Sequence, residues 1–136
     1  MKRMLLGLML LMTAGAASAA ERFTCQYVTK IKAVNLSGKA PKAEVSTIKE
    51  RYAFYVDPTG KASYVNLETG SKDDITAERF GAGWHFSELP SKGDNLFLVT
   101  IFTTKTSDGT FPSLWSFHAW KDIDFYAPTL SYGYCR

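Results

Sequence analysis

Two runs of β-branched and aromatic residues, separated by a short polar segment, dominate the C-terminal half of the chain. They lie between Leu96 and Trp120 and flank a segment that contains Asp108-Gly109 and Pro112. β-branched and aromatic residues favour strands, and Asp-Gly favours a tight turn. Because the connection is too short for a crossover helix, this stretch predicts an antiparallel hairpin.

Alternation of apolar and polar residues predicts further strands earlier in the chain. Residues 22–32 and 46–56 both alternate with a period of two, which is typical of half-buried strands. In the first strand, one face is expected to carry Phe23, Cys25, Tyr27, Thr29 and Ile31, and the opposite face Lys30 and Lys32. In the second, Ile48, Glu50, Tyr52, Phe54 and Val56 share a face.

Turn residues divide the rest of the chain into short extended segments. Asp57-Pro58-Thr59-Gly60 predicts a tight turn that leads into a partner strand at 62–67. Residues 73–80 are expected to form a strand rather than a helical turn, and residues 84–89 and 123–135 are also expected to be extended. Residues 34–45 predict a loop or a poor strand, because they contain Asn, Ser, Gly and Pro.

Together these segments predict an all-β fold, an antiparallel meander of seven or eight strands. A small up-and-down barrel is preferred, and a two-sheet sandwich is the alternative. The two cysteines, Cys25 and Cys135, lie near the ends of a single domain at 20–136. A disulfide between them would tie the first strand to the last, which suits a closed sheet.

The first 19 residues predict a cleaved secretory signal peptide. Met1-Lys2-Arg3 is followed by an apolar run and by Ala17-Ser18-Ala19, a small-x-small cleavage pattern. The apolar run is too short to be a transmembrane anchor, and no second apolar run in the sequence approaches membrane-spanning length. We therefore expect a periplasmic or secreted protein that is not inserted in a membrane after cleavage.

Removal of this segment leaves little net charge. Lys2 and Arg3 account for two of the 16 basic residues, so 14 basic and 13 acidic residues remain, a balance of +1. Such a balance gives no electrostatic reason to expect nucleic acid as a partner.

Aromatic residues form the candidate binding site. If the fold is a barrel, its inner face is expected to bind an apolar or aromatic small molecule. The candidate residues are Trp84, Phe86, Trp115, Phe117, His118 and Trp120. The alternative function is a protein-interaction module, such as an inhibitor, immunity or accessory protein, that uses a sheet edge or an aromatic surface with tyrosines such as Tyr52, Tyr64 and Tyr132.

Catalysis ranks third among the functional hypotheses. His85 lies near Glu88 and His118 near Asp122 in sequence, so a hydrolase that uses a histidine as a base is conceivable. The chain has no Gly-x-Ser-x-Gly elbow and no His-Glu-x-x-His motif. We therefore predict no catalytic residues, no metal site and no cofactor.

Overall fold

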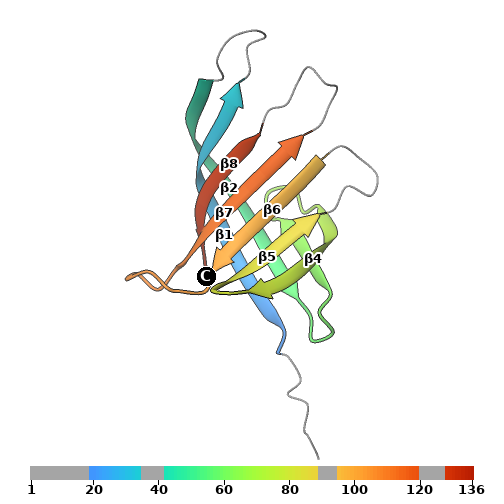
Figure 1. The fold of residues 1–136 in the computed structure, drawn as a ribbon. Helices are drawn as coiled ribbons and strands as arrows, with labels where there is room; N and C mark the ends of the chain where they lie inside the picture. Colours follow the sequence, from blue (N-terminus) through green and yellow to red (C-terminus); the bar gives the residue numbers. More distant parts are fainter. Residues whose placement is uncertain (1–18, 35–41, 89–94, 120–127) are drawn as a thin grey trace, which may run out of the picture.

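Eight antiparallel strands form a closed barrel in the computed structural model, which describes residues 19–34, 42–88, 95–119 and 128–136 (Figure 1). Each strand pairs with the next one, and the last pairs with the first. The predicted barrel is therefore confirmed, and the sandwich alternative is wrong. The strands are β1 (Glu21–Val34), β2 (Lys42–Val56), β3 (Ala62–Asn66), β4 (Lys72–Phe80), β5 (Gly83–Glu88), β6 (Asn95–Phe102), β7 (Phe111–Ala119) and β8 (Thr129–Cys135).

The strand boundaries follow the sequence prediction closely; of the extended segment expected at 123–135, residues 129–135 form β8 and residues 123–127 lie outside the described part of the chain. Of residues 34–45, expected to form a loop or a poor strand, Val34 ends β1 and 42–45 form the exposed start of β2, so the strand alternative is correct there, and 35–41 lie outside the described residues. The strand expected at 73–80 is confirmed as β4. The signal peptide prediction concerns residues 1–19, of which residues 1–18 lie outside the described part of the chain. Those described ranges contain no helix long and apolar enough to cross a membrane.

Short polar turns connect the strands at the end of the barrel where β2 meets β3. The carboxylate of Asp57 accepts hydrogen bonds from the Thr59 amide at 2.8 Å and from the Lys61 amide at 2.9 Å. Gly60 adopts a φ of 86°, which favours glycine because it has no Cβ. The predicted Asp57–Gly60 turn is thus built by its own side chain and its glycine.

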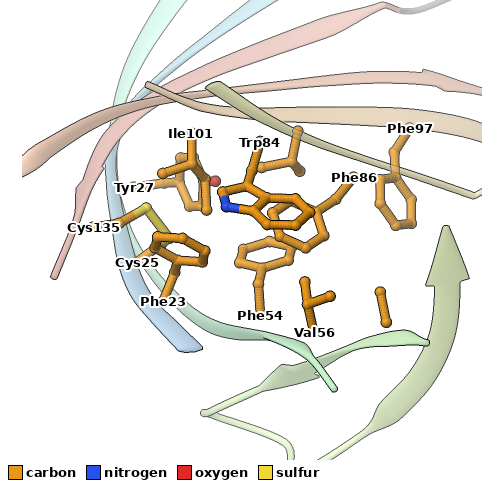
Figure 2. Close-up of a cluster of buried hydrophobic side chains, with 12 residues drawn as sticks. Phe23, Cys25, Tyr27, Phe54, Val56, Trp84, Phe86, Phe97, Ile101 and Cys135 are labelled. Atoms are coloured by element: carbon orange, nitrogen blue, oxygen red, sulfur yellow. A yellow bond between two sulfur atoms is a disulfide. The ribbon is translucent and has the colours of Figure 1, made fainter. Parts of the chain in front are cut away.

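Aromatic side chains fill the interior. Phe54 and Phe86 are fully buried, with ring centroids 5.0 Å apart, and Trp84 stacks on Phe86 at 6.1 Å. Figure 2 shows these rings and Phe23 gathered beside the disulfide. Burial of several large rings is the main source of stability expected for such a barrel.

Two hydrogen-bonded hydroxyls lie within this apolar interior. The hydroxyl of Tyr27, a fully buried residue, is 2.8 Å from Ser113 Oγ, and Ser113 donates to the carbonyl oxygen of Thr100 at 3.1 Å. Because serine has a single hydroxyl hydrogen, Tyr27 is the donor to Ser113. The chain of bonds satisfies both buried hydroxyls and links β1 to β7 and β6 across the barrel.

The wall of the barrel is uneven in height. β2 has 15 residues and β3 only five, and they pair over Tyr52–Val56 alone. The first part of β2, Lys42–Glu50, pairs with β1 on one side and with no described strand on the other. In Figure 1 the β1–β2 hairpin accordingly extends well past β4 and β5.

The barrel closes where β1 meets β8. Cys25 and Cys135 are directly opposite each other and form the predicted disulfide, which confirms that pairing. Two residues before Cys135, Gly133 lies opposite Tyr27. A Cβ at Gly133 would lie 2.2 Å from the carbonyl oxygen of Gln26 and 2.8 Å from Tyr27 Cα. Only glycine therefore allows the two strands to approach this closely.

We expect Gly133→Ala to lower the free energy of unfolding by at least about 3 kcal/mol, because the clash involves backbone atoms that cannot move aside. Urea denaturation of the oxidised protein, followed by tryptophan fluorescence, measures the change. The matched control is Gly70→Ala, at a turn position where a Cβ meets open space but φ is 75°. That control should lose about 1 kcal/mol from backbone strain. Equal losses in the two variants would contradict the close-approach explanation.

Candidate ligand-binding pocket

A pocket of about 180 Å³ opens at the end of β1 and β8 that lies away from the disulfide. The lining residues come from β1, β2, β7 and β8, and none comes from β3 to β6. They are Lys30, Glu50, Tyr52, Trp115, Phe117, Thr129 and Ser131. The pocket thus combines three aromatic side chains with four polar ones.

Trp115 forms the aromatic wall with Tyr52. The centroids of the two rings are 4.3 Å apart, and the rings meet edge to face. Trp115 also packs against Tyr27 at 5.4 Å and Phe97 at 5.5 Å. Rings from three other strands hold the indole in one orientation, so this side of the pocket is formed before any ligand binds.

An ion pair between Lys30 and Glu50 forms the charged part of the lining. Lys30 Nζ is 2.6 Å from Glu50 Oε1, and the two side chains are 31% and 36% exposed. The hydroxyl of Tyr52 donates a longer bond, 3.5 Å, to Glu50 Oε2. Water therefore reaches the pair and screens it, and its contribution to stability is modest.

A register shift places Lys30 in the pocket. Alternation along β1 predicts Lys30 on the face opposite Tyr27, but the pairing with both β2 and β8 shifts between Tyr27 and Thr29. Beyond the shift, Lys30 lies opposite Ser131, a buried pocket residue. The predicted orientation of Lys30 is therefore wrong, because a β-bulge reverses the faces of the strand.

The structure divides the predicted site residues among four places. Trp115 and Phe117 line the pocket. Trp84 and Phe86 belong to the apolar core, and the Trp84 indole N–H donates to Glu21 at the other end of the barrel. His118 lies on the outer face of β7, where its ring bonds to Ser116 at 2.7 Å. Trp120 lies outside the described residues.

Several pocket residues were missed by sequence reasoning. Glu50 carried the available signal: it lies between Ile48 and Tyr52 on a strand face that is otherwise apolar or aromatic. A carboxylate on such a face requires a partner, which is Lys30. Ser131 and Thr129 had no comparable signal, because small hydroxyl residues are common in strands.

The surface aromatic prediction is only partly correct. Tyr132 is 45% exposed on the outer face, whereas Tyr52 and Tyr64 pack against the interior rings. Asp122, the carboxylate expected beside His118, lies outside the described residues, so the histidine hypothesis stays a prediction. His85 bonds to Thr100 on the outer face of β5, so the described fold brings neither histidine to the pocket. Within the described ranges, no group of three or more His, Cys, Asp or Glu side chains is placed to hold a metal ion.

Burial changes the acidity of the interior tyrosines. It raises the pKa of Tyr52 to about 12, and the negative charge of Glu50 adds to the effect. It likewise raises the pKa of Tyr64 to about 12, with a further contribution from Asp73. Burial also raises the pKa of Tyr27, against the opposing effect of its bond to Ser113.

Comparison with protein-family models gives no match to this chain, and comparison with curated proteins gives no significant match. The function must therefore be inferred from the pocket and the surfaces of the barrel.

The tyrosine shifts predict a loss of stability at alkaline pH. An exposed tyrosine ionises near pH 10, so between pH 10 and 12 the folded state holds protons that the unfolded state has released. The stabilisation is complete below pH 10 and declines as the pH rises toward 12. Urea midpoints between pH 8 and 11.5 measure it. Tyr52→Phe should flatten the decline, and an unchanged slope in that variant would contradict the assignment.

Proposed function

We propose that the protein is an exported binding protein that holds one small molecule in the pocket beside Trp115. The observation that carries the proposal is the composition of the lining. Binding sites are typically concave and mainly apolar, with a few polar groups that orient the ligand. Here Tyr52, Trp115 and Phe117 supply the apolar part, and the Lys30–Glu50 pair and two hydroxyls supply the polar part.

The size of the pocket limits the ligand. A dry cavity of about 150 Å³ accepts one benzene molecule in a well-studied engineered protein. A pocket of about 180 Å³ therefore fits one six-membered ring with a small substituent. Larger ligands would have to extend out of the mouth.

Export is supported by two features of the chain. The predicted signal peptide directs secretion, and disulfides persist mainly in oxidising compartments such as the periplasm and the extracellular medium. The Cys25–Cys135 bond is compatible with either location.

Native mass spectrometry of the protein purified from its own host tests the proposal. We expect a non-covalent adduct that is lost on denaturation. Ser131→Leu should abolish the adduct, because it fills the pocket, whereas Ser116→Leu, on the outer face of the neighbouring strand, should retain it. An unliganded wild-type mass, or an adduct that survives in a folded Ser131→Leu variant, would contradict the proposal. Near-ultraviolet circular dichroism verifies that both variants fold.

An alternative function, a protein-interaction module, is supported by the edge of β2 over Lys42–Glu50, which pairs with no strand in the described part of the chain. Residues 42–47 of this edge are all exposed, and Val45 is 68% exposed. A free edge can pair with an extended segment of another chain. A second copy of the protein is the occupant that fits. Antiparallel pairing centred on Ser46 places Lys42 opposite Glu50 of the other copy and brings no like charges directly opposite each other.

Size-exclusion chromatography with light scattering tests this alternative at micromolar concentration. Pairing through β2 predicts a dimer for the wild type and a monomer for Lys42→Glu, which would place two acidic residues opposite each other. Lys72→Glu, an exposed substitution on β4, is the matched control and should leave the dimer intact. A monomeric wild type would exclude edge pairing between copies.

A further inference from the structure

We infer that the pocket selects a small aromatic carboxylate, with the ring against Trp115 and Phe117 and the carboxylate at Lys30 and Ser131. The inference rests on the proposed function and specifies the chemistry of its ligand. It depends on three observations: the order of the side chains across the wall, the hydrogen-bond groups still available, and the charge that each candidate ligand would meet.

The order of side chains across the wall matches a ring attached to an acid. Ser131 of β8 lies directly opposite Lys30 of β1 on one side and directly opposite Trp115 of β7 on the other. Adjacent strands are about 5 Å apart. An ammonium, a hydroxyl and an indole therefore follow one another in a single row. Thr129 and Phe117 are paired in the next row toward the mouth.

The hydrogen-bond groups in the pocket include more free donors than occupied ones. Lysine has three N–H donors, and Lys30 uses one of them on Glu50. The hydroxyls of Ser131 and Thr129 form no side-chain hydrogen bond with any described residue. Both oxygens of Glu50 already accept a bond, one from Lys30 and one from Tyr52. An incoming group rich in acceptors fits this arrangement.

The charges of Lys30 and Glu50 cancel, and the unoccupied donors favour a carboxylate over an ammonium ion. A carboxylate can bind the free donors of Lys30 while the bond to Glu50 remains, and charge-assisted bonds of this kind are stronger than neutral ones. An ammonium ion would have to compete with Lys30 for Glu50, whose two oxygens already accept bonds, whereas a carboxylate lies near the charge of Glu50 but meets the unoccupied N–H donors of Lys30. A neutral ligand would form no ion pair with Lys30, so the remaining N–H donors of that lysine would stay hydrogen-bonded to water.

Three matched probes test the inference: benzoate, benzyl alcohol and benzylamine. Calorimetry on the oxidised full-length protein at pH 7 and low salt should show benzoate binding at least tenfold more tightly than either of the others. Lys30→Met should reduce benzoate affinity to that of benzyl alcohol and leave benzyl alcohol binding unchanged. Lys72→Met, which removes an exposed lysine outside the pocket, should change neither affinity.

Lys30→Met leaves the carboxylate of Glu50 without its ion-pair partner, which destabilises the fold. A second variant therefore keeps the test valid if Lys30→Met does not fold. Lys30→Met/Glu50→Met removes both charges and should also abolish the preference for benzoate. Similar affinities for all three probes in the wild type would overturn selection of a carboxylate while leaving the proposed function in place. Tightest binding of benzylamine would overturn it as well and would assign recognition to Glu50. Binding of no probe would overturn both this inference and the proposed pocket.

Discussion

The pairing of β1 with β8 is the interaction on which the rest of the barrel depends. It converts a meander into a closed sheet, and closure leaves β1 and β8 paired on both sides over most of their length. Two features support it at neighbouring positions: the Cys25–Cys135 bond and the missing side chain of Gly133. The second feature matters because Tyr27 lies directly opposite Gly133 and directs its ring into the core, where Ser113 accepts its hydrogen bond. Close approach at the seam thus positions the central polar link of the interior.

The register shift within this β1–β8 pairing marks the boundary between the filled core and the pocket. Up to Tyr27, the inward residues of β1 are Phe23, Cys25 and Tyr27, all buried in the aromatic core. The register then shifts, and the next residue of β1 that lines the interior is Lys30. A regular strand would have placed Thr29 there and turned the lysine to solvent. One bulge therefore changes the chemistry of the interior from apolar to ionic within three residues.

Sequence patterns predicted the architecture well because strands with one buried face leave a period of two, and turns such as Asp57–Gly60 carry their own chemistry. They predicted the site poorly for two physical reasons. The bulge after Tyr27 depends on how β1 fits two neighbours at once, and the residues around it, Val28 and Thr29, are ordinary strand residues. The height of a residue along the barrel axis also depends on strand register. Trp84 and Trp115 look alike in sequence, yet Trp84 packs in the core and Trp115 lines the pocket.

The pocket and the free edge of β2 have a common origin in the short β3. Where β3 ends, no described strand lies beside Glu50 to supply further side chains to the interior, and the backbone of β2 has no second partner among the described strands. Glu50 belongs to both features, since it pairs with Lys30 inside and ends the unpaired part of the strand. A chain added along this edge would therefore change the surroundings of the ion pair. The proposed ligand site and the proposed edge contact would therefore share Glu50, so a substitution of Glu50 would affect both.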